Sequence, residues 1–123
     1  HLPSDDEWKE LEMALGMSQA EADDEFWRGT NEGSKLAGNT ILWLGGSLQN
    51  DAEFGTSGFT ALPGGNRRLN GYFTYVGYDG YWWSATEYGT ISAWRRRLGY
   101  DHSSVHRYDN DKGNGFSVRC LRD

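Results

Sequence analysis

Hydrophobic and polar residues near the start of the chain recur with the period of an α-helix. Apolar residues stand at spacings of three and four from Trp8 to Leu15, and Gly16 follows them. Just before this stretch, Ser4 and Glu7 have the spacing of a capping box, in which each side chain satisfies a backbone group of the other residue. This pattern predicts a helix that begins after Ser4 and ends at Gly16.

The same signals recur directly after the first predicted helix. Ser18 and Glu21 repeat the spacing of the capping box. The apolar residues Phe26 and Trp27 follow, and Gly29 is the next residue suited to end a helix. We therefore predict a second short helix that carries Phe26 and Trp27 and ends at Gly29.

From residue 29 onward, short apolar runs alternate with Gly, Asn and Asp, which is typical of strands and tight turns. Helices followed by strands indicate an α+β fold with an antiparallel sheet, rather than a parallel sheet with helices between its strands. No repeat and no linker divides the chain, so residues 1–123 are expected to form a single domain. The strand-like runs are Gly71–Val76, Tyr81–Ala85, Ala93–Tyr100, Ser104–Tyr108 and Gly115–Leu121.

Neighbouring residues of a strand point to opposite faces of its sheet. In the run Ala93–Tyr100, Arg96 therefore shares a face with Trp94, whereas Arg95 and Arg97 lie on the other face. The three consecutive arginines cannot form one basic patch, and no further basic stripe accompanies them. We expect no nucleic-acid partner.

Aromatic residues compensate for the modest hydrophobic content of the chain. Hydrophobic residues make up 37% of it, but six Trp, seven Tyr and five Phe supply large areas to bury. No apolar run approaches the roughly 20 residues that cross a bilayer, and no signal-peptide pattern opens the chain. The first residue is His1 rather than Met, so we expect a processed product or a piece of a longer protein.

Acidic residues are concentrated in the first part of the chain. Residues 1–53 hold twelve Asp and Glu but three Lys and Arg, whereas residues 54–123 hold six acids and nine bases. Asp5, Asp6 and Glu7 fall in the first turn of the first predicted helix, where the helix dipole favours negative charge. This structural role explains these acids, so no catalytic carboxylate pair is expected.

The spacing of the remaining polar residues does not favour catalysis or metal binding. His102 and His106 lack a third ligand at a suitable spacing, and neither is paired with a nucleophile. Residues 109–115 resemble half of a calcium loop but lack its distal Glu, so an ordinary turn is the favoured interpretation. We expect a protein that is not an enzyme and that uses no metal and no cofactor.

Four motifs follow one another along almost the whole chain: His1-Leu-Pro-Ser-Asp-Asp-Glu-Trp, Ala61-Leu-Pro-Gly-Gly, Gly80-Tyr-Trp-Trp-Ser-Ala-Thr-Glu and Gly115-Phe-Ser-Val-Arg-Cys. Together they resemble the Fibrobacter succinogenes major paralogous domain. That family is similar to the C-type-lectin-like superfamily, which includes formylglycine-generating enzymes and the variable proteins of diversity-generating retroelements. The resemblance implies a C-type-lectin-like α+β fold with two helices flanking a twisted antiparallel sheet. It also implies a secreted or cell-surface protein of a bacterium or its phage.

The chain departs from the family pattern in its thiols and at its start. The resemblance implies further strands before the first Leu-Pro motif and an upstream Cys as partner for Cys120, but Cys120 is the only cysteine. We expect it to be a buried thiol in the last strand, with an intermolecular disulfide as the alternative. Formylglycine generation needs two active-site thiols, and the Glu-Pro-Asn and Trp-Asn-Asp motifs of calcium-dependent lectins are absent.

The later part of the chain has the composition expected of a diversified surface. From Phe54 onward there is no Gln or Met, one Lys and one Glu. The irregular positions hold amino acids that an AAC codon reaches when only its adenines change, although ordinary strand and turn composition is an alternative explanation. Tyr, Ser, Asn, His and Arg are also residues that paratopes use. The candidate ligand-binding residues are Tyr88, Arg95, Arg97, Tyr100, Asp101, His102, Ser104, His106, Tyr108, Asp109 and Asp111.

We therefore predict a non-enzymatic binding or display module with a variable C-terminal surface, adhesin-like, that takes a protein or glycan ligand at the cell surface, outside the cell or on a phage particle. The segment Tyr100–Asn114 is expected to form short strands and tight turns. Substitutions of the ligand-facing residues are expected to leave the stability of the scaffold nearly unchanged, because these side chains would be exposed. Trp94 and one of Trp82 and Trp83 would belong to the core.

Two alternatives remain open from the sequence. One is a carbohydrate-binding surface domain in which exposed tyrosines stack on sugar rings, although packing within the sheet is the favoured role for at least half of them. The other is a degenerate enzyme of the formylglycine-generating type. The tyrosines concerned are Tyr72, Tyr75, Tyr78, Tyr81 and Tyr88.

Overall fold

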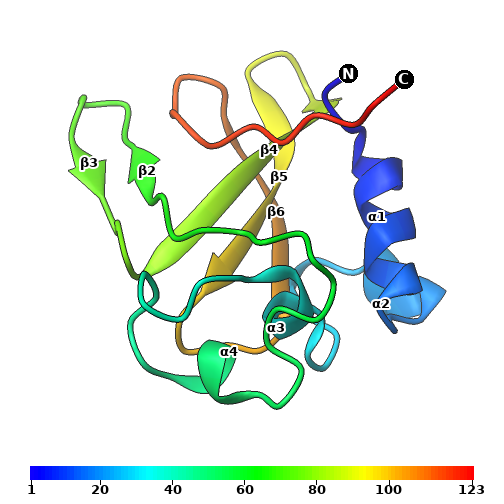
Figure 1. Ribbon diagram of the computed structural model, residues 1–123. Helices are drawn as coiled ribbons and strands as arrows, with labels where there is room; N and C mark the ends of the chain where they lie inside the picture. Colours follow the sequence, from blue (N-terminus) through cyan, green and yellow to red (C-terminus); the bar gives the residue numbers. More distant parts are fainter.

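A four-stranded antiparallel sheet runs through the middle of the molecule (Figure 1). The computed structural model describes all residues, 1–123. A separate hairpin of two very short strands, β2 (Asn66–Arg67) and β3 (Phe73–Thr74), lies beside this sheet. The four strands of the main sheet lie in the order β1 (Phe26–Arg28), β6 (Val105–Asp111), β5 (Ser92–Gly99) and β4 (Asp79–Tyr88).

Few and short helices accompany the sheet. The longest, α1, lies along one face of the sheet, while α3 and α4 lie near the turn from β5 to β6 (Figure 1). These elements confirm the predicted α+β class with a mostly antiparallel sheet. The helices are α1 (Asp5–Ala14), α2 (Gln19–Asp23), α3 (Glu32–Leu36) and α4 (Ser47–Asn50).

The predicted capping box at the start of α1 is present. Ser4 Oγ accepts a hydrogen bond from the backbone N–H of Glu7 at 3.1 Å, and the Glu7 carboxylate accepts from the backbone N–H of Ser4 at 2.8 Å. The chain leaves the helix through Gly16, whose φ of +128° lies in the left-handed region that glycine adopts without strain. The first predicted helix is therefore confirmed.

The second predicted helix is correct at its start and wrong at its end. Ser18 Oγ accepts from the backbone N–H of Glu21 at 3.1 Å, but α2 ends at Asp23. Phe26 and Trp27 lie in β1, which pairs with β6 from the distant end of the chain. A helix of five residues is marginal by itself, and the free edge of β6 supplies the backbone of β1 with hydrogen-bond partners. Long-range pairing has overridden the local helical pattern.

The predicted strand Gly115–Leu121 is not formed. This segment makes only isolated bridges, in which Ser117 donates to the carbonyl of Tyr81 at 2.9 Å and accepts from the N–H of Trp83 at 3.2 Å. The segment then leaves the sheet, and Val118 is exposed. Phe116 is half-buried against Tyr81 and Trp83, on the face of the sheet opposite the core.

The other predicted strands are present with different lengths. The predicted strands Tyr81–Ala85, Ala93–Tyr100 and Ser104–Tyr108 correspond to β4, β5 and β6. The segment Tyr100–Asn114 consists of a turn, β6 and a second turn, as predicted. The run Gly71–Val76 contains only the two-residue strand β3. It is cut short because Gly71 and Tyr75 both have positive φ angles, +88° and +66°, which no extended strand contains.

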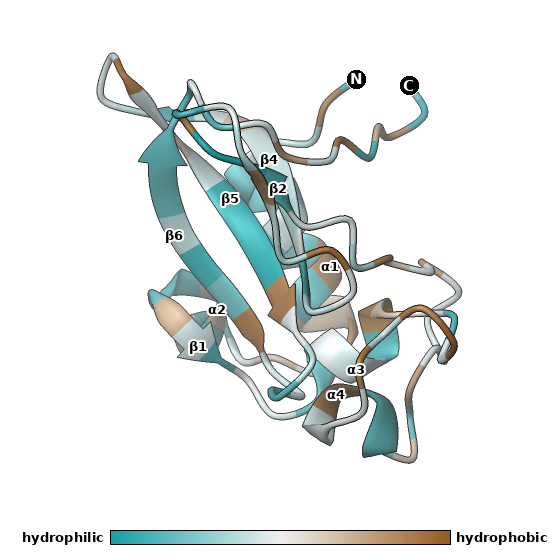
Figure 2. Ribbon diagram, turned by 90° about the vertical axis from the view of Figure 1, so that its left-hand side faces the viewer, coloured by the Kyte–Doolittle hydropathy of each residue, from teal (hydrophilic) through white to brown (hydrophobic).

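The hydrophobic core lies at the end of the sheet that carries Leu98 and Val105, beneath α1, α3 and α4. Figure 2 shows β5 and β6 as hydrophilic over most of their length and hydrophobic at this end. Trp82 belongs to the core, whereas Trp83 lies on the opposite face against Phe116, as strand alternation predicts. The core consists of Trp8, Met17, Ala22, Leu36, Ala37, Trp43, Leu48, Ala61, Trp82, Leu98 and Val105.

Charged side chains fill the space between α1 and the middle of the sheet. Arg96 donates to Asp5 at 2.6 Å and to Glu12 at 3.0 Å, and Arg107 donates to Asp5 at 2.7 Å. Arg28, from β1, donates to Glu12 at 2.8 Å. Burial raises the pKa of Asp5, but the hydrogen bonds and charges of Arg107 and Arg96 outweigh it, so its pKa is lowered overall. Each of these buried arginines has a carboxylate partner, as buried charges require.

Trp94 is outside the core, contrary to the prediction. Its ring is half-buried and lies under the guanidinium of Arg107, 3.9 Å from the ring centre, while Tyr88 packs against it edge-on. The cation–π contact takes the place of the apolar neighbours that a core tryptophan would have.

The two ends of the chain lie side by side (Figure 1). His1 and Leu121 exchange two backbone hydrogen bonds of 2.8 Å. Cys120, beside this pair, is a free and exposed thiol, so the favoured prediction of a buried cysteine is wrong. The reason is that the last segment runs over the surface instead of entering the sheet. None of the helices has the length and apolar character needed to cross a membrane.

Candidate functional site

The strands that carry most of the predicted site residues turn one face away from α1. The strand register pairs Arg97 with Tyr81 on one side and with His106 on the other, and it pairs Arg95 with Tyr108. Because Arg96 points toward α1, alternation sends Arg95 and Arg97 to the opposite side. We call this surface the outer face and define it by Tyr81, Arg95, Arg97, His106 and Tyr108.

Aromatic rings from β1 extend the outer face. Trp27 stacks on His102 with ring centres 3.8 Å apart and planes within 2°, and it packs edge-on against His106. Phe26 stacks on Tyr108 at 5.0 Å and is largely exposed. The φ of Phe26 is +63°, an unfavourable conformation for a bulky residue, which turns its ring onto Tyr108.

Arg97 lies between two of these rings. Its guanidinium carbon is 5.3 Å from the ring centre of Trp27 and 5.7 Å from that of Tyr81. One nitrogen, Nη2, donates to Asp79 at 3.1 Å, but Nε is buried and has no hydrogen-bond partner. Burial raises the pKa of Asp79, although the charge of Arg97 opposes that shift.

Arg95 is buried without a carboxylate. Only 6% of the residue is exposed, and its hydrogen bonds go from Nε to the Asn110 amide oxygen at 2.7 Å and from Nη1 to His106 Nδ1 at 2.7 Å. Burial and the nearby charges of Arg97 and Arg96 lower the pKa of Arg95 to about 10. It therefore remains a cation at neutral pH, with neutral groups as its hydrogen-bond partners.

The contact with Arg95 determines the tautomer of His106. A guanidinium can only donate, so Nδ1 of His106 must accept, and the proton of the neutral ring is on Nε2. Burial and the positive charges of Arg95 and Arg97 lower the pKa of His106 to about 3. At neutral pH the outer face thus presents His106 as an N–H donor without charge.

Of the remaining predicted residues of the β5–β6 turn, only Asp101 lies at the rim of the outer face. Asp101 lies beside His102, 2.9 Å from its Nδ1, and is exposed. Tyr100 instead packs edge-on against Tyr78 and covers part of the core. Ser104 is half-buried, and its backbone contacts α3.

Three predicted residues lie elsewhere. Asp109 pairs with Trp94 and so belongs to the face that points toward α1. Asp111 accepts from the backbone N–H of Gly113 at 2.7 Å and forms part of a turn, and Tyr88 packs on Trp94. The structure therefore brings Arg95, Arg97, His102, His106 and Tyr108 together, and leaves Tyr88, Asp109 and Asp111 outside that group.

The burial of two site residues contradicts the expected separation of site from scaffold. Arg95 and His106 are 6% and 9% exposed, so both are part of the packed sheet. Phe26 and Trp27 were not among the predicted site residues, because the local pattern placed them on a helix. Two adjacent aromatic residues were the signal in the sequence, but only the pairing of β1 with β6 brings them to the outer face.

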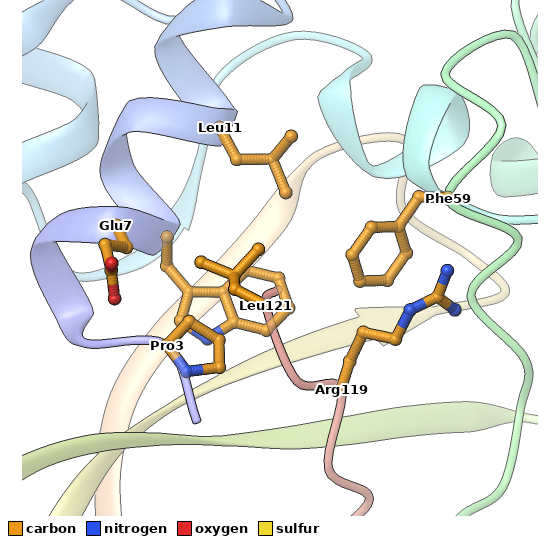
Figure 3. A pocket seen from close by; sticks show the side chains of 7 residues that line it. Pro3, Glu7, Leu11, Phe59, Arg119 and Leu121 are labelled. Carbon is orange, nitrogen blue, oxygen red and sulfur yellow. The ribbon is translucent and has the colours of Figure 1, made fainter. Parts of the chain in front are cut away.

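A mostly apolar hollow lies on the other side of the sheet, where α1 meets the last segment of the chain (Figure 3). It has a volume of about 150 Å³ and mostly apolar walls, with Glu7 and Arg119 among them. The indole N–H of Trp8, one of its walls, is buried and has no hydrogen-bond partner. The pattern of apolar residues could not separate these walls from ordinary core residues. The hollow is lined by Pro3, Glu7, Trp8, Leu11, Phe59, Arg119 and Leu121.

The two histidines of the predicted segment both pack against Trp27 but make different polar contacts. His102 stacks on Trp27, while His106 faces Arg95. No group of three or more His, Cys, Asp or Glu side chains is arranged to hold a metal ion. The donors and rings of the outer face are suited to hydrogen bonding and stacking.

Comparison with known proteins gives one match. The family model described as the Fibrobacter succinogenes major domain matches residues 1–122. No curated protein and no solved structure is significantly similar to the chain.

Proposed function

The chain belongs to the Fibrobacter succinogenes major domain family, and we propose that it is a non-enzymatic ligand-binding module that binds through its outer face. One observation carries the proposal. Exposed or half-exposed rings (Phe26, Trp27, His102 and Tyr108) surround guanidinium groups whose N–H donors are only partly used. Rigid aromatic area combined with available donors is the chemistry of recognition surfaces.

The contacts of the outer face support binding rather than catalysis. His106, the one buried imidazole of this face, accepts from Arg95 and has no nucleophile as a neighbour. The single thiol, Cys120, lies in the surface segment next to the chain ends. A degenerate enzyme of the formylglycine-generating type is the weaker alternative, and a peptide oxidation assay with wild type and Cys120→Ser tests it.

We further propose that the fold is C-type-lectin-like. A first helix packed against a twisted antiparallel sheet, with the two chain ends side by side, supports this assignment. On this proposal the protein works outside the cell, on a bacterial surface or on a phage particle, as an adhesin-like display module.

Variation of the binding surface by adenine-directed diversification is part of the same proposal. Exposed positions such as Ile91 and Asp101 can change without disturbing the packing. Gly89 is exposed, but its φ of +71° means that a side chain there would strain the backbone. Gly99 is more restricted, because an added Cβ would lie 3.2 Å from the ring of Trp27. Sequencing the gene across a cell population tests this, and changes at adenines confined to codons 89–114 are expected. A nearby reverse transcriptase gene and template repeat would accompany them.

A carbohydrate-binding role for the tyrosines is a second candidate, favoured by their exposure. Tyr72, Tyr75, Tyr78 and Tyr88 are exposed and only Tyr81 is buried. Tyr78 and Tyr88 also pack edge-on against Tyr100 and Trp94, so their free surface is smaller than that of Tyr72. Tyr72 and Tyr75 lie on and next to the β2–β3 hairpin, outside the strands β1, β5 and β6 that carry Phe26, Arg97 and Tyr108.

The decisive experiment compares two matched sets of aromatic substitutions on a glycan array and on arrays of cell-surface proteins. The outer-face variant carries Phe26→Ser, His102→Ser and Tyr108→Ser, and the hairpin variant carries Tyr72→Ser and Phe73→Ser. We expect the outer-face variant to lose the ligand of the wild type and the hairpin variant to keep it. The reverse result would assign binding to the hairpin and overturn the proposal.

A further inference from the structure

We propose that the ligand of the outer face is an acidic sugar, whose carboxylate accepts hydrogen bonds from Arg95, Arg97 and His106. This inference rests on the proposed function and specifies its ligand. It comes from the hydrogen-bond donors that the protein leaves unpaired, from the charge of the face, and from the rings beside it.

The donors of the outer face exceed its acceptors. Arg97 uses Nη2 for Asp79 and its Nε is buried without a partner, which leaves Nη1 as the donor open to a ligand. Arg95 uses Nε and Nη1, which leaves Nη2 free, and His106 has its proton on the unbonded Nε2. A surface that presents several N–H groups and few acceptors is complementary to a ligand with acceptor oxygens.

The charge of the face points to an anion. On the α1 side of the sheet, Arg28, Arg96 and Arg107 each pair with a carboxylate. On the outer face, Asp79 is the only carboxylate that bonds to an arginine, and Arg95 has none within 4.0 Å. A guanidinium binds a carboxylate strongly through two parallel N–H groups, so a ligand carboxylate would supply the missing counter-charge.

The rings beside these donors indicate what carries the carboxylate. Trp27 stacked on His102, and Phe26 stacked on Tyr108, present ring surfaces on two sides of the arginines. A pyranose ring has an apolar face of C–H groups that packs on such a surface, while its oxygens project from the edge. An acidic side chain of a protein offers the same carboxylate on a flexible stem without a flat body. The paired rings therefore favour the sugar.

The test uses two sugars that differ in the proposed group alone. Methyl β-D-glucuronide has a carboxylate where methyl β-D-glucoside has a CH₂OH group. We expect the glucuronide, but not the glucoside, to shift the NMR signals of Arg97 Nε–H, the Trp27 indole N–H and the His106 ring. The affinity should fall as salt is added, because a partly exposed ion pair is screened. N-acetylglutamate amide serves as the probe for an acidic peptide.

A pair of substitutions that preserves the local charge tests the assigned residues. The double variant Asp79→Asn with Arg97→Gln removes both members of the ion pair, so neither charge is left buried alone. We expect it to bind the glucuronide about ten-fold more weakly, the effect of losing one charge-assisted hydrogen bond. Arg68→Gln is the matched control, since Arg68 also lies over a tyrosine ring but on the hairpin side, and it should bind as the wild type does.

Three results would overturn the inference. They are equal binding of glucoside and glucuronide, stronger binding of the acetylglutamate amide than of the glucuronide, and no shift with any probe. None of these results contradicts the proposed function if the outer-face variant still loses the ligand that the wild type binds on the arrays. If that variant keeps the array ligand, the proposed function fails whatever the sugars do.

Discussion

Asp5 Oδ1 accepts a hydrogen bond of 2.6 Å from Nη1 of Arg96, although the two residues are 91 positions apart in the chain. The bond joins the first turn of α1 to the central strand β5. Arg107 binds the other oxygen of the same carboxylate at 2.7 Å. The sequence suggested only that Asp5 interacts favourably with the dipole of the first helix. In the structure Asp5 also attaches α1 to the sheet.

The first prediction concerns this attachment. Asp5→Asn removes the negative charge and leaves Arg96 and Arg107 without their shared partner, so it should lower the free energy of unfolding by about 3–5 kcal/mol. Urea denaturation measures the change. Asp6→Asn is the matched control, because Asp6 is exposed in the same helical turn, and it should change stability by no more than about 0.5 kcal/mol. Equal losses for both would show that the buried network contributes little.

The second prediction is a pH dependence from His106. Its pKa is about 3 when folded, below the ordinary value of 6.5, so the unfolded chain takes up the proton first as the pH falls. This uptake of a proton by the unfolded chain does not affect the free energy of unfolding above about pH 6.5. It lowers the free energy of unfolding as the pH falls toward 3, by at most about 1.4 kcal/mol per pH unit. His106→Asn, whose amide oxygen can still accept from Arg95, should remove this slope. His102→Asn should retain it.

The third prediction separates the buried from the exposed members of the outer face. Arg95→Ala with His106→Ala breaks the hydrogen bond between them and leaves Asn110 without its donor. We expect a loss of about 2–4 kcal/mol in thermal or urea unfolding, about 1–2 kcal/mol for each substitution. Tyr108→Ala, which removes one stacked ring from an exposed position, should cost at most about 1.5 kcal/mol. A larger loss for Tyr108→Ala than for the pair would contradict the burial seen in the structure.

The fourth prediction compares the adjacent tryptophans of β4. Trp82→Ala opens a cavity in the core and should cost about 3–5 kcal/mol of stability. Trp83→Ala removes a half-buried ring that stacks on Phe116, and its smaller contact area should make the loss smaller. The midpoints of urea unfolding measure both, and a greater loss for Trp83→Ala would reverse the assignment of the two faces.

The fifth prediction concerns the free thiol. Cys120 is exposed in the native protein, so one equivalent of a thiol reagent should react without denaturant and at the rate of an unhindered cysteine. Cys120→Ser should abolish the reaction and leave stability nearly unchanged. A thiol that reacts only after unfolding would return Cys120 to the buried position expected from the sequence.

The sequence by itself determined the features that depend on residues close together in the chain. The caps at Ser4 and Ser18 are local hydrogen bonds, and the opposite directions of Arg96 and Arg97 follow from strand alternation alone. The order of helices before strands likewise identified the α+β class. These predictions were correct because their physical causes act within a few residues.

Only the tertiary structure decided which surface Phe26 and Trp27 join and whether Arg95 and His106 are buried. The pairing of β1 with β6 joins residues from opposite ends of the chain, and the short local pattern was compatible with a helix as well. A polar residue can be buried only when its hydrogen-bond partners are assembled around it, and those of Arg95 come from β6. Contacts between distant segments therefore determine which residues form the outer face. The local sequence pattern determines only the strands on which most of these residues lie.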